Sequence, residues 1–131
     1  MSLILTIRTD KPTAELRLWL DDELKIEKVW YAHKELSAGI LQQIANILEK
    51  VDCQVKDLKG IVVYKGPGSF TGLRIGITTA NALAYSLRVP LVGATGENWQ
   101  KLGIEGLAKD LNDKIVIPFY GSEANVTKPR K

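Results

Sequence analysis

The chain has 131 residues, of which 45% are hydrophobic and 25% charged, and a formal net charge of +3 at pH 7. These values are typical of one globular domain and exclude collagen, a coiled coil and a largely disordered chain. A nearly neutral body followed by a basic tail, residues 121–131, is not the charge pattern of a nucleic-acid-binding face. The single cysteine, Cys53, excludes an internal disulfide framework and a zinc site built on several cysteines. No uncharged stretch reaches the roughly 20 residues that span a bilayer, and residues 1–7 do not resemble a signal peptide, so we expect a cytoplasmic protein.

The first part of the chain predicts three strands. Residues 3–7 are apolar, residues 15–20 are apolar at every second position, and residues 25–32 follow an acidic turn at residues 21–23. The links between these strands are short, which indicates an antiparallel meander.

The second part of the chain alternates helical and strand patterns. The predicted elements are a helix over 35–51, a strand at 60–64, a helix over 71–87, a strand at 91–93, a helix over 97–111 and a strand at 114–120. The order βββ-α-β-α-β-α-β predicts an α/β domain over residues 1–120, with a mixed sheet and helices on its faces. This layout is similar to the ribonuclease-H-like fold, which also forms each lobe of the actin-like ATPases.

The sequence offers little for catalysis. A nuclease on this fold needs several carboxylates from the sheet to hold two metal ions, and the strands predicted at 3–7 and 60–64 carry none, so we expect no metal site. Asp10 stands alone after the first strand and is interpreted as a turn residue. His33, the single histidine, has no assignable nucleophile; we interpret it as a residue at the start of the first helix, with contact to a partner as the alternative. Cys53 is interpreted as an inert thiol.

A glycine-rich segment at residues 66–72 joins the predicted buried strand to the second helix. Free N–H groups at the start of a helix can bind an anion. The segment lacks the Gly-Lys-Ser/Thr ending of a P-loop, and its glycines are spaced one residue too far apart for Gly-x-Gly-x-x-Gly. The residues favour a tight turn with Ser69 or Thr71 as the N-cap, and a nucleotide contact is the alternative.

The second predicted helix has a wide apolar surface. Small residues recur at every fourth position, large apolar residues flank them, and only a narrow polar strip lies opposite: Arg74, Thr78, Asn81 and Tyr85. The first helix also has an apolar flank outside its main stripe. One face of a sheet cannot cover both helices fully, so the surplus indicates an interface with another protein, or two helices that cover each other. The candidate interface residues are Leu41, Ala45, Leu48, Gly72, Leu73, Gly76, Ile77, Ala80 and Ala84.

Residues 66–76 read Gly-Pro-Gly-Ser-Phe-Thr-Gly-Leu-Arg-Ile-Gly, which resembles the signature of the TsaB (YeaZ) family. The signature-loop residues are Gly66, Pro67, Gly68, Ser69, Phe70, Thr71 and Arg74. Residues 33–35, 56–58 and 89–93 are similar to family segments at the same places. The resemblance covers residues 1 to about 111, the first of the two lobes usual in the family. Residues 118–120 resemble the family's C-terminal Pro-x-Tyr segment, so we expect a natural short form without the second lobe.

The first strand departs from the family pattern, because it ends in Arg8-Thr9-Asp10 where family members usually carry Asp-Thr-Ser or a similar sequence. This departure removes the expectation of a family ligand contact at that strand.

The resemblance implies a role in making N6-threonylcarbamoyladenosine (t6A) beside the anticodon of tRNA. It implies a catalytically silent subunit that pairs with and activates a TsaD-type transferase through its first two helices, and that supports recruitment of the ATPase TsaE. It implies no cofactor held by this chain alone and leaves open a nucleotide at the partner interface. We expect a homodimer in isolation, and contact with tRNA that is indirect or made through the basic tail. The alternatives are a self-pairing regulatory homodimer and a hydrolase on a ribonuclease-H-like fold.

Overall fold

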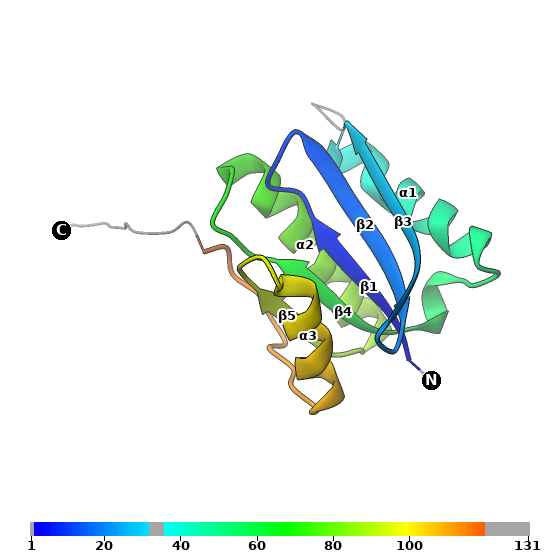
Figure 1. The fold of residues 1–131 in the computed structure, drawn as a ribbon. Helices are drawn as coiled ribbons and strands as arrows, with labels where there is room; N and C mark the ends of the chain where they lie inside the picture. The colour runs from blue at the N-terminus through cyan, green and yellow to red at the C-terminus, as the bar shows by residue number, and fades with distance from the viewer. Residues whose placement is uncertain (1, 32–35, 120–131) are drawn as a thin grey trace.

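The computed structural model describes residues 2–31 and 36–119 and places five strands in one mixed sheet, in the order β3-β2-β1-β4-β5 (Figure 1). The strands are β1 (Leu3–Arg8), β2 (Thr13–Leu20), β3 (Glu23–Tyr31), β4 (Leu58–Tyr64) and β5 (Leu91–Ala94). The first three form an antiparallel meander, and β4 and β5 continue the sheet in parallel with β1. Both features were predicted from the short links of the first part and the alternating pattern of the second.

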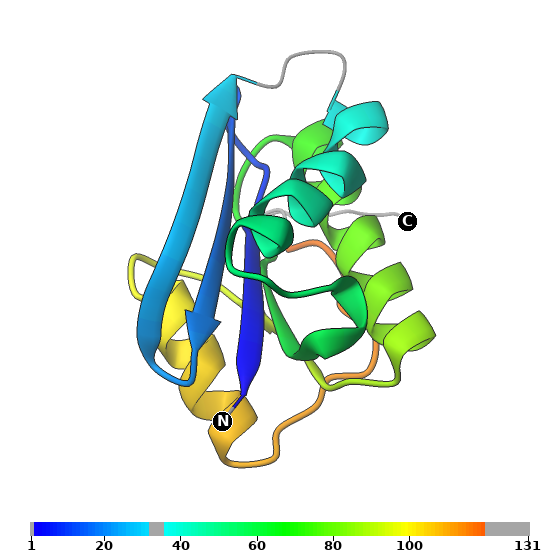
Figure 2. The same ribbon diagram turned by 90° about the vertical axis from the view of Figure 1, so that its right-hand side faces the viewer.

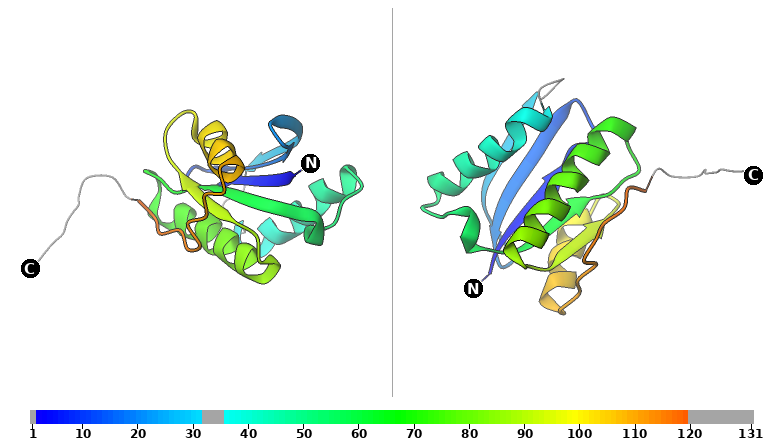
Figure 3. Two further views of the ribbon diagram at one scale, coloured as in Figure 1. Left: turned by 90° about the horizontal axis from the view of Figure 1, so that it is seen from below. Right: turned by 180° about the vertical axis from the view of Figure 1, so that it is seen from behind.

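Helices cover both faces of the sheet (Figure 2). The helices α1 (Leu36–Lys50) and α2 (Phe70–Leu87) lie on one face and contact each other (Figure 3), and α3 (Trp99–Ala108) lies on the other face. A short 3-10 helix, η2 (Val55–Asp57), leads into β4. The predicted helices are confirmed, with small shifts at their ends.

The position of each strand explains its sequence pattern. The central strands β1 and β4 are covered on both faces, and their apolar side chains are nearly all buried. In β2, by contrast, Ala14, Leu16 and Leu18 point into the core below α1, while the alternate residues lie on the side that α3 leaves partly open. The core therefore sits mainly between the sheet and the α1–α2 layer.

The strand expected at residues 114–120 is absent from the part of it that the structure describes, which ends at Phe119. The backbone N–H of Val116 donates to Oδ1 of Asn81 at 2.9 Å, and Nδ2 of Asn81 donates to the carbonyl of Val116 at 3.0 Å. Because a side chain of α2 occupies both backbone groups of Val116, this residue does not pair with β5. The prediction of a last strand is wrong for the described residues, and the expected boundary at residue 120 and the tail lie outside them.

Candidate functional site

The stripe of small residues on α2 faces the sheet. Gly76 is buried, and a Cβ atom at its position would collide with the hydroxyl of Thr9, which follows β1. A Cβ atom at Gly72 would collide with the carbonyl oxygen of Thr9. Glycine therefore allows the start of α2 to approach the end of β1 closely.

This packing corrects most of the predicted partner interface. The interface prediction is wrong for the residues that are buried within a single chain, because their side chains or Cα atoms fill the space between the helices and the sheet. These residues are Leu48, Leu73, Gly76, Ile77, Ala80 and Ala84. Gly72 is half-buried, whereas Leu41 is 57% exposed and Ala45 is also exposed.

The outward side of α2 carries residues that sequence reasoning assigned to a polar strip. Tyr85 is 88% exposed, and Thr78 and Ala82 are exposed on the same side of the helix. Arg74 is exposed as well, but it has an interaction of its own. We use the name outer helix face for the exposed apolar residues of these two helices, which are Leu41 and Ala45 of α1 and Ala82 and Tyr85 of α2; Tyr85 lies toward Asn112 and Lys114. The signal that sequence reasoning passed over is an aromatic residue within a strip of polar ones.

The end of β1 fastens the signature loop and the start of α2. The hydroxyl of Thr9 donates to the carbonyl of Gly72 at 2.6 Å and accepts from the N–H of Gly76 at 3.1 Å. The carbonyl of Asp10 accepts from the N–H of Ser69 at 3.3 Å. Ser69 is the N-cap residue, as predicted, although its side chain makes no capping hydrogen bond. The loop is therefore held from outside the helix, by residues that follow β1.

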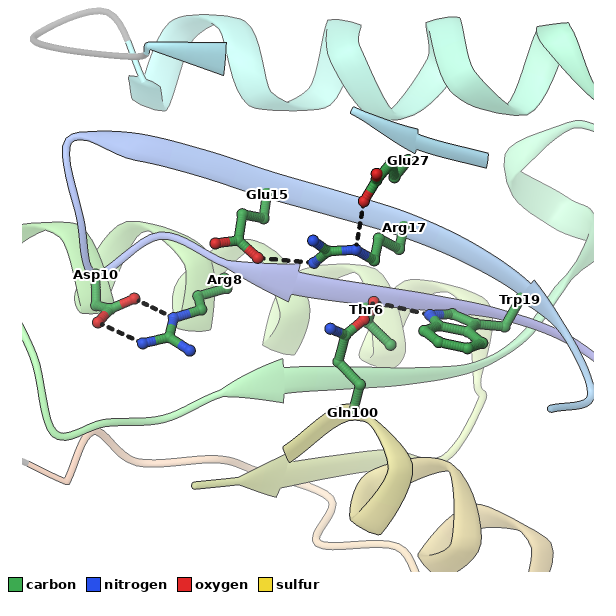
Figure 4. Close-up of polar contacts among 8 residues, drawn as sticks. All are labelled: Thr6, Arg8, Asp10, Glu15, Arg17, Trp19, Glu27 and Gln100. Atoms are coloured by element: carbon green, nitrogen blue, oxygen red, sulfur yellow. Dashed lines mark hydrogen bonds and ion pairs between the residues drawn. The ribbon is translucent and has the colours of Figure 1, made fainter. Parts of the chain in front are cut away.

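Asp10 is buried and forms an ion pair with the half-buried Arg8 (Figure 4). Nε of Arg8 lies 2.7 Å from Oδ1 of Asp10, and Nη2 lies 3.2 Å from Oδ2, so the guanidinium holds both carboxylate oxygens. The two side chains are 16% and 5% exposed. A Cβ atom at Gly68 would collide with the Asp10 side chain, so the signature loop covers the carboxylate. Asp10 lies in a bend, but the simple turn interpretation missed this pair.

The same guanidinium lies over an aromatic ring. Cζ of Arg8 is 3.8 Å from the ring centroid of Tyr64, and the Tyr64 hydroxyl donates to the carbonyl of Pro67 at 2.7 Å. Burial lowers the pKa of Arg8, but the hydrogen bond and charge of Asp10 outweigh burial and raise that pKa above its ordinary value. Burial raises the pKa of Tyr64, and the positive charge of Arg8 offsets only part of that rise. Arg8 is therefore a permanent cation that neutralises Asp10.

A second polar cluster lies on the part of the sheet beside α3 (Figure 4). The guanidinium of Arg17 contacts Glu15 at 2.7 Å and Glu27 at 2.9 Å. The Thr6 hydroxyl donates to the Gln100 side chain at 2.9 Å and accepts from the Trp19 indole at 3.1 Å. These groups satisfy one another, as polar groups on a partly covered sheet must.

Among the described residues, metal-binding and other reactive groups form no further site. Within residues 2–31 and 36–119, no group of three or more His, Cys, Asp or Glu side chains is placed to hold a metal ion. Cys53 is half-buried, and its thiol donates to the carbonyl of Val51 at 3.4 Å. His33 and the side chain of Phe70 lie outside the described residues. Among the described helices, none is long and apolar enough to cross a membrane.

The order and pairing of the strands, with helices on both faces of the sheet, define a single lobe of the ribonuclease-H-like class. T. thermophilus RuvC, solved with a Holliday junction substrate, matches with a TM-score of 0.54 at 10% identity, covering 92% of this chain and 85% of RuvC. YeaZ from Pseudomonas aeruginosa matches with a TM-score of 0.67 at 22% identity, covering 72% of this chain and 44% of that chain. At these identities, both likenesses show the fold.

Comparison of sequences identifies the family, which the likeness in fold does not. A family model described as "TsaD: tRNA N6-adenosine threonylcarbamoyltransferase" matches residues 30–95. The tRNA threonylcarbamoyladenosine biosynthesis protein TsaB of Bacillus subtilis is 40% identical over 88 residues, which are 67% of this chain and 38% of that protein. TsaB of Escherichia coli is 33% identical over 97 residues, 70% of this chain and 39% of that protein. The chain belongs to the TsaB/YeaZ family and spans about two fifths of the length of these relatives, corresponding to one lobe.

Proposed function

We propose that this chain is a non-catalytic accessory subunit of t6A synthesis that pairs with a TsaD-type transferase and activates it. The observation that carries the proposal is the outer helix face. Leu41 is 57% exposed and Tyr85 is 88% exposed, on two helices that contact each other on one face of the sheet. Exposed apolar side chains on adjoining helices are suited to packing against helices of another protein.

The end of β1 supports an accessory role. The Asp10 carboxylate is held at both oxygens by Arg8 and covered at Gly68, so it is not free to ligate a metal or to act as a base. In this proposal the transferase supplies the chemistry, and this lobe supplies a binding surface. TsaE and tRNA then meet the assembled pair, and this chain contacts tRNA indirectly or through its basic tail.

The test is the mass of the complex formed with the TsaD-type protein of the same organism, measured by light scattering on size-exclusion peaks. The wild-type chain should give a one-to-one complex. Leu41→Glu should weaken pairing at least about tenfold, because it buries a charge without a partner.

Leu102→Glu is the matched control, because Leu102 is 56% exposed and lies on α3, on the opposite side of the sheet. Equal loss of pairing by both variants would contradict the proposed surface. A wild-type homodimer that ignores the transferase would instead favour the self-pairing alternative, and the same two variants would then show whether the outer helix face forms that dimer.

A further inference from the structure

An apolar groove of about 460 Å³ opens at the amino ends of β1 and β4, between α3 and the turn that joins β2 to β3. Its apolar lining includes Ile4, Pro90, Ile104 and Leu107. The volume lies within the range of small-molecule sites, which is roughly 300–1,000 Å³. The signature loop lies at the other end of these strands, so the groove is separate from that loop and from the Arg8–Asp10 ion pair that it covers.

Acidic groups dominate the rim of this groove. Among the described residues, Asp21, Asp22 and Glu105 line it together with one cation, Lys59. In the described ranges 2–31 and 36–119, the ion pairs found include none of these three carboxylates. The position of the acidic turn is fixed, because Asp21 accepts from the N–H of Ser2 at 2.9 Å and its own N–H donates to the carbonyl of Ser2 at 2.8 Å.

The combination of an apolar lining and an acidic rim limits the chemistry of a ligand. An anion would be repelled by the three carboxylates, and an inorganic cation would make no use of the apolar surface. A neutral apolar compound would make no use of the rim. An alkyl chain that ends in an ammonium group matches both parts, since the chain can lie on Ile4 and Leu107 while the charge faces the carboxylates.

We propose that this groove binds an aliphatic amine. Free diamines and polyamines have this chemistry, and so does a lysine side chain of a polypeptide. The groove is lined by α3, whereas the outer helix face belongs to α1 and α2 on the other side of the sheet. Amine binding therefore does not depend on pairing with a TsaD-type protein, and either proposal can fail alone.

The first experiment is an NMR titration of the full chain across the millimolar range with cadaverine, with its neutral match pentanediol, and with lysine capped at both backbone ends. The amines should shift the backbone amide signals of Asp22 and Gly60 in a saturable manner, and pentanediol should not. Tighter binding of cadaverine identifies a free amine as the ligand, and tighter binding of capped lysine identifies a polypeptide side chain.

Four single variants make the test specific. Asp22→Asn and Glu105→Gln should each weaken amine binding about two- to fivefold, the usual effect of one exposed ion pair. Lys59→Gln should strengthen binding by a similar factor, which damage to the fold would not do. Glu97→Gln makes the same charge change at an exposed residue just before α3, away from the groove, and should leave binding unchanged.

Three results would overturn the proposal. These are equal shifts with pentanediol and cadaverine, affinities that the two acidic variants leave unchanged, and no saturable shift with either amine.

Discussion

The two sides of α2 carry residues of similar size but meet different surroundings. On the inner side, Gly76 and Ala80 are buried against the end of β1 and the core. On the outer side, Thr78 and Ala82 are exposed. A stripe of small residues therefore indicates that a helix closely approaches a neighbouring surface, and the sheet of the same chain is as good a candidate for that surface as another protein.

Hydrogen bonds that position the helix are made on its inner side and at one flank. Thr9 bonds to both Gly72 and Gly76 on the inner side, and half-buried Asn81, within the second half of the helix, bonds to Val116. The outer side contributes two apolar members of the outer helix face, Ala82 and Tyr85. We therefore expect inner substitutions to change stability and outer substitutions to change pairing.

The largest effect is expected from Gly76→Leu. The new side chain must displace Thr9 and break its two hydrogen bonds, so the free energy of unfolding should fall by about 4 kcal/mol or more. Ala82→Leu is the matched control on the outer side and should change stability by less than about 0.5 kcal/mol. Urea unfolding followed by circular dichroism measures both. A Gly76→Leu variant as stable as the wild type would show that the inner and outer sides do not differ as described.

A smaller loss of stability is expected from breaking the Arg8–Asp10 ion pair, which lies under the signature loop before α2. Arg8→Met leaves the Asp10 carboxylate buried without its cation, which should cost about 3 kcal/mol in the same urea experiment. The double variant Arg8→Met with Asp10→Asn removes both charges and should recover most of that loss. If the double variant is no more stable than Arg8→Met alone, packing of the Arg8 side chain against Tyr64 matters more than its charge.

Much of the fold could be predicted because its signals are local. The change from strand to helical period after the third strand, and the apolar run before the signature loop, fix the order of the elements with no knowledge of contacts. The side of α2 that faces the sheet could not be assigned in this way, because it depends on Thr9, which precedes Gly76 by 67 positions. The prediction of a last strand was wrong for the same reason, because it also depended on a contact between residues far apart in the sequence. The Asn81 side chain forms hydrogen bonds with the backbone N–H and carbonyl of Val116.

The site was predicted less well than the fold, although one signal was available. Arg8 and Asp10 are two positions apart at the end of an extended segment, and alternate residues of a strand point to the same side. An ion pair between them was therefore open to prediction. The tyrosine that lies under the guanidinium comes from β4 and could be found only from the pairing of β1 with β4.

The smallest expected effect is on the pH dependence of stability and concerns Tyr64, which is buried beside the signature loop. Tyr85, on the outer side of α2, is the residue for comparison. Burial raises the pKa of Tyr64 above the ordinary value of 10.0, so as pH rises the unfolded chain loses this proton before the folded one does. The contribution of Tyr64 to the free energy of unfolding is complete below about pH 10 and is lost as pH rises through the folded-state pKa. Urea unfolding at several pH values from about 8 to about 11 should show this decline in the wild type and a shallower decline in Tyr64→Phe.

Tyr64→Phe should also lower stability at neutral pH by about 1 kcal/mol, because the hydrogen bond to the Pro67 carbonyl is lost. Tyr85→Phe, on the exposed outer side, is the control for loss of a hydroxyl and should keep the wild-type stability at neutral pH. A slope that Tyr64→Phe leaves unchanged would mean that the alkaline decline comes from other groups. The ring beneath Arg8 would then hold the loop through contact and hydrogen bonding alone, with no part in its response to pH.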